Sequence, residues 1–75
     1  MAQIVLSRAN FIREMTAGKF DQYLICVDES ANEKEHYILA RTDDGTELVL
    51  GTIGYERRTW SNIVPPADFL RECGV

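Results

Sequence analysis

The residues with the clearest chemical potential are a cysteine and a histidine. Cys26 is one of two cysteines, and His36 is the only histidine. A cysteine acts as a nucleophile when a nearby base takes its proton and its sulfur is accessible. Cys26, however, lies in an apolar run over 23–27, which is typical of a buried structural thiol. The strand register derived below also points Cys26 and His36 to opposite faces of a sheet. We therefore expect no catalytic cysteine and no enzymatic activity.

The sequence predicts no metal and no cofactor. A structural zinc site takes about four Cys or His ligands, and the chain has only Cys26, Cys73 and His36, with no CxxC pair. Gly51 and Gly54 stand three positions apart, but the third glycine and the helix start of a phosphate-binding loop are missing.

Paired carboxylates occur at two places, residues 28–29 and residues 43–44. Acid–base catalysis needs two carboxylates in different environments of one cleft. Both pairs instead fall in polar segments between apolar runs, where Asp serves as a turn residue. We interpret them as turns and keep Asp43 and Asp44 as a candidate acidic contact with a partner.

The segment over 55–60 carries the strongest binding signal. It contains Tyr55, Arg57, Arg58 and Trp60, and Trp60 is the only tryptophan in the chain. Trp, Tyr and Arg are enriched at the energetic centres of protein interfaces. Arginine beside aromatic rings also grips single-stranded nucleic acid. A structural alternative is that the aromatic residues complete the core while the arginines are solvated or pair with acids.

Local patterns predict an α+β fold in a single domain over residues 1–75. Ser7 is a suitable helix N-cap and Gly18 a suitable helix stop. The strands are expected to form an antiparallel meander of three or four strands, between an N-terminal helix and a short C-terminal helix. The expected elements are an apolar start over 1–6 that could be an edge strand, a helix over 8–17, strands over 22–28, 35–42 and 46–53, a fourth strand or a loop over 59–64, and a helix over 67–73 opened by Pro65-Pro66.

The turn over 43–45 sets a strand register. A three-residue loop ending in Gly45 joins the two strands, and it places opposite charges across from each other. The preceding hairpin sets two acids opposite each other, which is a mild objection to its register. The predicted pairs are Thr42 with Thr46, Arg41 with Glu47, Ala40 with Leu48, Leu39 with Val49, Ile38 with Leu50, Asp28 with Glu35, Ile25 with Ile38 and Leu24 with Leu39.

This register gives the sheet two apolar faces, where a sheet with one wet face would alternate apolar and polar residues. Either the two helices cover one face each, or the sheet curls around itself, or a partner or second copy completes one face. The first face carries Tyr23, Ile25, Val27, Ile38, Ala40, Leu48 and Leu50, and the second carries Leu24, Cys26, Tyr37, Leu39 and Val49.

Composition narrows the function classes. Hydrophobic residues make up 45% of the 75 residues and charged residues 27%, which argues against disorder. The net charge of −4 disfavours a general nucleic-acid binder and an anionic membrane surface. The sequence shows no signal-peptide pattern and no apolar run of about 20 residues, and its cysteine usage suits a reducing cytoplasm.

We therefore expect a non-enzymatic protein-binding module. A plausible setting is a small regulator or inhibitor of a larger protein or nucleoprotein complex, of the kind that phage and plasmid genomes encode. The expected contact residues are Tyr55, Arg57, Arg58 and Trp60, with Asp43 and Asp44. The expected partner is a protein, and a homodimer through one sheet face is compatible with it. The alternative is a nucleic-acid-binding protein that uses Arg57, Arg58 and Trp60.

Overall fold

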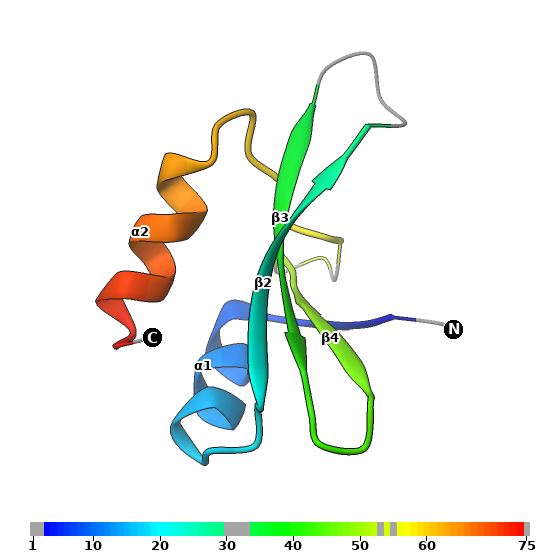
Figure 1. The fold of residues 1–75 in the computed structure, drawn as a ribbon, viewed down its shortest axis with the longest axis vertical. Helices are drawn as coiled ribbons and strands as arrows, with labels where there is room; N and C mark the ends of the chain where they lie inside the picture. Colours follow the sequence, from blue (N-terminus) through cyan, green and yellow to red (C-terminus); the bar gives the residue numbers. More distant parts are fainter. Residues whose placement is uncertain (1–2, 30–33, 53, 55, 75) are drawn as a thin grey trace.

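The computed structural model describes residues 3–29, 34–52, 54 and 56–74, and these residues form an α+β fold (Figure 1). The prediction of this fold class is confirmed. The fold consists of two helices and a four-stranded sheet. The elements are β1 (Ile4–Leu6), α1 (Arg8–Thr16), β2 (Gln22–Asp28), β3 (Glu35–Arg41), β4 (Glu47–Leu50) and α2 (Val64–Glu72). The three strands β2, β3 and β4 follow one another along the chain.

The sheet is mixed, with strand order β1-β4-β3-β2. β2, β3 and β4 form two consecutive antiparallel hairpins, but β1 pairs in parallel with β4, so that Val5 lies opposite Val49. The predicted purely antiparallel meander was therefore wrong. The apolar start of the chain precedes α1, and its strand joins the sheet on the far side of β4, beside a strand more than 40 residues later in the sequence.

The predicted register of both hairpins is confirmed. Leu39 pairs with Val49 across β3 and β4, and Ile25 pairs with Ile38 across β2 and β3. Arg41 faces Glu47 as expected, and the two form an ion pair at 2.9 Å. The turn chemistry explains this outcome, because Gly45 adopts the positive φ of 87° that a glycine tolerates best.

The predicted apposition of two acids, Asp28 and Glu35, is also present. The structure removes the objection to it, because Arg57 forms an ion pair with Asp28. A cation from a later segment of the chain therefore compensates the two like charges at this end of the β2–β3 hairpin.

The N-terminal helix begins where its cap predicts. The Ser7 hydroxyl accepts a hydrogen bond from the backbone N–H of Asn10 at 3.3 Å. The C-terminal helix, in contrast, begins at Val64, so the prediction that it starts at Ala67 was wrong. Pro65 and Pro66 lie inside its first turn, where the N–H that proline lacks has no partner within the helix anyway.

Of the two alternatives for the segment over 59–64, a fourth strand of the meander or a loop, the structure shows no strand there: its residues run outside the sheet until α2 begins at Val64. Trp60 makes only an isolated antiparallel bridge with His36, closed by backbone hydrogen bonds of 2.7 and 2.9 Å. β4 also ends at Leu50, earlier than predicted, and Ile53 lies outside the described residues. The chain thus leaves the sheet after Leu50 and touches β3 again at Trp60.

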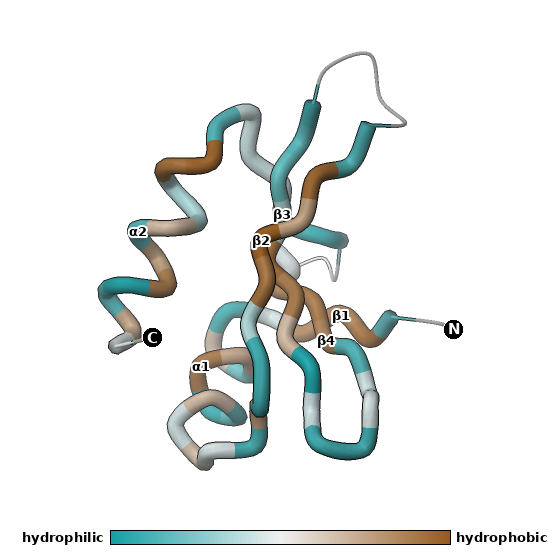
Figure 2. Tube along the Cα trace, in the orientation of Figure 1, coloured by the Kyte–Doolittle hydropathy of each residue, from teal (hydrophilic) through white to brown (hydrophobic). Residues whose placement is uncertain are grey.

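Both helices pack on the first face of the sheet (Figure 1), so of the alternatives for covering the two faces, one helix on each is wrong. Phe11 of α1 is fully buried at the centre of the core, and its ring centroid lies 6.4 Å from that of Phe69 in α2. Figure 2 shows the most hydrophobic residues gathered where the strands cross this core. The buried core residues are Phe11, Phe20, Ile38, Ala40, Leu50 and Leu70.

The second face has its own buried centre. Leu39 and Val49 retain only 3% and 1% of their accessible surface. Both are therefore buried within the single chain, and neither needs a partner to leave water.

Candidate functional site

The candidate site lies where the chain returns to the sheet after β4. The backbone N–H of Thr52 donates to the carbonyl of Glu56 at 2.7 Å, and that of Arg58 donates to the carbonyl of Leu50 at 2.9 Å. Gly51 and Arg57 form an antiparallel bridge. Because this returning stretch is extended, consecutive side chains point to opposite sides of it.

Arg57 points to the second face of the sheet, where it contacts Tyr37 and Asp28. Its guanidinium carbon lies 4.1 Å from the centroid of the Tyr37 ring, and the group forms an ion pair with Asp28. Its side chain is 31% exposed and that of Asp28 is 23% exposed. These contacts tie the returning segment to β2 and β3, so Arg57 stabilises the fold.

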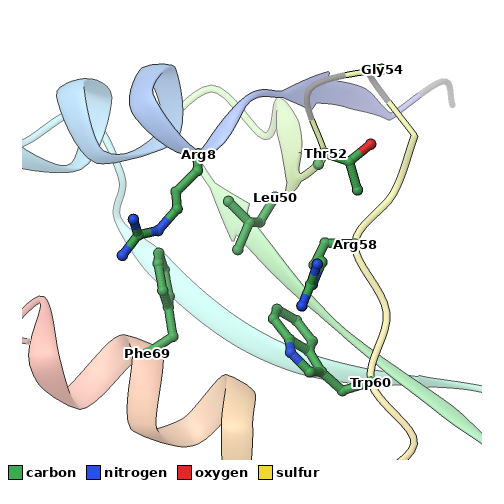
Figure 3. Close-up of a pocket in the computed structure, with 8 residues that line it drawn as sticks. Arg8, Leu50, Thr52, Gly54, Arg58, Trp60 and Phe69 are labelled. Atoms are coloured by element: carbon green, nitrogen blue, oxygen red, sulfur yellow. The ribbon is translucent and has the colours of Figure 1, made fainter.

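Arg58 points to the first face, toward the helices. Its guanidinium carbon lies 5.3 Å from the centroid of the Trp60 ring, and Trp60 packs against the core. Figure 3 shows the guanidinium lying over the indole ring. Of the two neighbouring arginines, only Arg58 is therefore presented next to the tryptophan.

A second arginine–aromatic pair completes the site from two other elements. Arg8 of α1 lies with its guanidinium carbon 5.6 Å from the centroid of the Phe69 ring of α2. The two pairs flank a pocket of about 530 Å³, and Leu50 lies between them (Figure 3). The lining residues are Arg8, Leu50, Gly51, Thr52, Gly54, Arg58, Trp60 and Phe69.

The pocket is basic although the chain is acidic overall. Its described lining includes two arginines and no carboxylate, in a chain of net charge −4. Within the described part of the chain, neither Arg8 nor Arg58 has an ion-pair partner. Arginine binds carboxylate and phosphate through a planar set of donors, and its stacking on an aromatic ring orients that set. The pocket therefore suits an anionic group attached to an apolar one.

Asp43 and Asp44 lie elsewhere, at the turn between β3 and β4. That turn follows the end of β3, whereas Trp60 bridges to His36 near its start, a separation of about 20 Å along the strand. The structure therefore does not bring the two acids together with Arg58 and Trp60.

Asp44 already has partners within its own turn. Its carboxylate accepts hydrogen bonds from the Thr42 hydroxyl and from the backbone N–H of Thr46, the latter at 3.0 Å. These bonds, the one from Thr42 foremost, lower the pKa of Asp44 from 3.8 to about 2. The carboxylate holds the hairpin turn, as the sequence indicated.

Tyr55, the remaining predicted contact residue, lies outside the described residues. His36 and Cys26 point to opposite faces of the sheet, as the confirmed register requires. The Nδ1 atom of His36 lies 3.3 Å from the carbonyl oxygen of Trp60, the same oxygen that accepts the backbone N–H of His36 at the bridge.

Two further observations concern the described residues as a set. No three His, Cys, Asp or Glu side chains among them are grouped so that they could hold a metal ion. Neither α1 nor α2 is long and apolar enough to cross a membrane.

Sequence reasoning missed Arg8 and Phe69. The position of Arg8 in the first turn of a helix was a signal that the sequence offered. A cation there is disfavoured by the helix dipole, so its presence suggests a role other than helix stability. Phe69 carried no such signal, since an aromatic residue on a short helix is ordinarily core. Only the packing of α1 beside α2 brings the two side chains together.

Comparison of the chain with protein-family models, with curated proteins and with solved structures gives no match.

Proposed function

We propose that this chain is a non-enzymatic protein-binding module, and that its binding element is the pocket between Arg8–Phe69 and Arg58–Trp60. The observation that carries the proposal is the pairing of two arginines, free of ion pairs with described residues, with two aromatic rings around one apolar floor. The partner presents a carboxylate next to an apolar side chain. This role suits a small regulator or inhibitor of a larger protein or complex, and the cytoplasmic setting inferred from cysteine usage is part of the proposal.

The size and chemistry of the site favour a protein partner. A pocket of about 530 Å³ accommodates one or two side chains, and its residue types are those that dominate binding energy at protein interfaces. The apolar floor rewards burial of a hydrophobic side chain, while the arginines require an anion beside it. A peptide segment with an acidic and an apolar residue meets both demands.

Nucleic acid is the second candidate, because Arg58 over Trp60 resembles a stacking site for a base with a cation nearby for its phosphate. The acidic net charge weighs against it, since binding through phosphates needs many cations. Salt dependence separates the candidates, because phosphate contacts are lost steeply as salt rises.

The experiment is capture of partners on the immobilised chain from its native lysate, with nuclease treatment, at two salt concentrations. The test variant is Arg8→Ala/Arg58→Ala. A matched control, Arg13→Ala/Arg71→Ala, removes the same charge from two exposed helix positions outside the pocket. We expect a discrete protein that is retained by the wild type and the control at high salt and lost with the test variant.

Two outcomes contradict the proposal. If the test variant retains the partner as well as the control does, the pocket is not the binding element. If only nucleic acid is recovered and high salt releases it, the nucleic-acid alternative is correct. Trp60 supplies a direct readout in either case, because its fluorescence is that of the only tryptophan and it lines the pocket.

A further inference from the structure

The sheet ends on one side in a long edge strand. β2 and β1 are the two edges of the described sheet, with seven and three residues respectively. Natural sheets protect their edges with short strands, Pro, Lys, inward-pointing charges or bulges. β2, with the sequence Gln-Tyr-Leu-Ile-Cys-Val-Asp, has none of these, and all seven of its residues pair with β3 in unbroken register. Its outer edge therefore carries a regular row of backbone donors and acceptors ready for another strand.

β2 also exposes an apolar side chain. Val27 retains 46% of its accessible surface, in a strand whose other apolar residues are all less exposed. Val27 lies on the first face, and it pairs with His36 toward the open end of the β2–β3 hairpin. A strand added along β2 would cover it.

We propose that β2 pairs with β2 of a second copy of this chain, antiparallel about a two-fold axis at Ile25, to form a continuous eight-stranded sheet. This proposal is independent of the pocket, whose described lining includes no residue of β2.

The sequence of β2 is complementary to itself in this arrangement. Gln22 of one copy faces Asp28 of the other, where the Gln amide can donate to the carboxylate. Tyr23 faces Val27, an aromatic and β-branched pair of the kind that stabilises sheets. Leu24 faces Cys26, and Ile25 faces its own counterpart. Within Gln22–Asp28 no like charges face each other and no charged residue faces an apolar one, and immediately outside the strand Asp21 lies across from Glu29.

The register follows from geometry. A two-fold axis perpendicular to the sheet relates the two antiparallel edge strands and keeps corresponding faces on the same side. Because directly opposed residues point to the same face, the axis must pass between a residue and its own counterpart in the second copy. An axis at Leu24 would set Asp21 against Val27, and an axis at Cys26 would set Asp28 against Leu24. Only an axis at Ile25 uses all seven residues of the strand.

The rest of the fold is compatible with this assembly. α1 packs on β1 and β4, and α2 packs on β3, so the helix layer is centred away from β2. In the dimer, the sheet formed by the described residues ends on both sides in a copy of β1. Each is three residues long, which is too short to template further pairing. The arrangement is therefore closed at two copies.

The first test is the mass of the chain in solution, measured by size exclusion with light scattering over a range of concentrations. We expect a species of twice the chain mass of 8.5 kDa. Val27→Lys places a charge at the edge twice per dimer and should weaken the dimer about tenfold or more. The matched control is Ile63→Lys, at a position 52% exposed and outside β2. We expect the control to dimerise like the wild type, and circular dichroism checks that both variants are folded.

The second test traps the register. In a Cys73→Ser background treated with oxidised glutathione, which takes up the two electrons, Leu24→Cys should form a disulfide-linked dimer with the native Cys26 of the second copy, because the two positions face each other. Arg71→Cys in the same background is the control, with a side chain 81% exposed on α2.

A wild type that stays monomeric at millimolar concentration overturns the proposal. So does a dimer that Val27→Lys leaves unchanged, or one in which Leu24→Cys crosslinks no faster than Arg71→Cys. The variant Arg8→Ala/Arg58→Ala should dimerise normally, so failure of the pocket and failure of the edge are distinguishable.

Discussion

Arg57 and Arg58 are neighbours in the sequence, and their guanidinium groups lie on opposite faces of the sheet, one over Tyr37 and the other over Trp60. The backbone over Arg57–Trp60, which bridges to Gly51 at one end and to His36 at the other, imposes this division because consecutive side chains of an extended stretch point to opposite sides. It separates an arginine that stabilises the fold from one that lines the pocket beside Trp60. Reversing the charge of both arginines together would therefore confuse a loss of stability with a loss of binding.

The first prediction separates the two arginines by stability. Arg57→Ala removes a partly buried ion pair and a cation–π contact, which together contribute about 1–2 kcal/mol. For a chain of this size we expect the melting temperature to fall by about 4–8 °C per kcal/mol. Arg58→Ala should lower the melting temperature less, because the exposed Arg58 loses its cation–π contact with Trp60 but has no ion-pair partner among the described residues.

Thermal unfolding followed by circular dichroism measures the difference between the two variants. Arg57→Lys is a useful intermediate, because it keeps the charge and loses the planar stacking on Tyr37. Equal melting temperatures for Arg57→Ala and Arg58→Ala would show that the ion pair of Arg57 with Asp28 adds nothing to the stability of the chain.

The second prediction concerns the close approach of β1 to Gly51. A Cβ atom at Gly51 would lie 2.3 Å from Cγ1 of Val5 and 3.0 Å from the carbonyl oxygen of Glu56. Gly51→Ala should therefore destabilise the chain by about 1–3 kcal/mol through overpacking. Gly54→Ala is the control, because the nearest atom to its Cβ would be 3.9 Å away.

Urea unfolding of the two glycine variants checks this prediction. Adding Val5→Ala to Gly51→Ala removes the shortest contact but not the one with the Glu56 backbone, so it should restore only part of the lost stability. A Gly51→Ala variant as stable as Gly54→Ala would mean that β1 does not approach β4 as closely as the structure shows.

The third prediction is a pH dependence at the β3–β4 turn. The pKa of Asp44 is lowered to about 2 in the folded chain, so the folded state favours the charged carboxylate. This contribution to stability is fully present above the ordinary pKa of 3.8 and is lost as the pH falls through about 2. Asp44→Asn removes it at every pH.

We therefore expect Asp44→Asn to melt below the wild type at pH 6 and to approach it as the pH falls to about 2. Glu47, whose pKa is lowered by its hydrogen bond with Arg41, is present in both proteins and cancels in the comparison. A melting difference that stays constant from pH 6 to pH 2 would contradict the assigned role of Asp44.

The parts of the fold that follow from local chemistry were predictable from the sequence. The registers of both hairpins could be read from Gly45, from the alternation of side chains and from the facing charges of Arg41 and Glu47. The cap at Ser7 is a contact within one helical turn. Each of these features is decided by residues close together in sequence or directly across a hairpin.

Most of the predictions that were wrong concern features that depend on distant parts of the chain. Three apolar residues at the start carry too little information to name β4 as their partner. The face that each helix covers is set by shape, through contacts such as that of Phe11 with Phe69. The predicted start of α2 was wrong for a local reason, because Pro65 and Pro66 are compatible both with the first turn of a helix and with the residues just before it.

The candidate site likewise contains residues that the sequence predicts and residues that only the packing brings together. Arg58 and Trp60 could be predicted from their residue types, because they stand two positions apart on an extended segment. The split between Arg57 and Arg58 could not, since it depends on where the returning segment meets the sheet. Arg8 and Phe69 are contributed by two helices about 60 residues apart, and no short pattern joins them.

The parallel pairing of β1 with β4 also bears on the order in which the chain is made. Of the four strands of this sheet, β1 is synthesised first and its partner β4 last. Both hairpins can close as soon as their own residues emerge, whereas β1 must stay unpaired until the whole of β4 has followed it. The apolar strand β1 thus stays unpaired while β2, β3 and β4 are made, and the earliest made of the four strands is the last to find its partner.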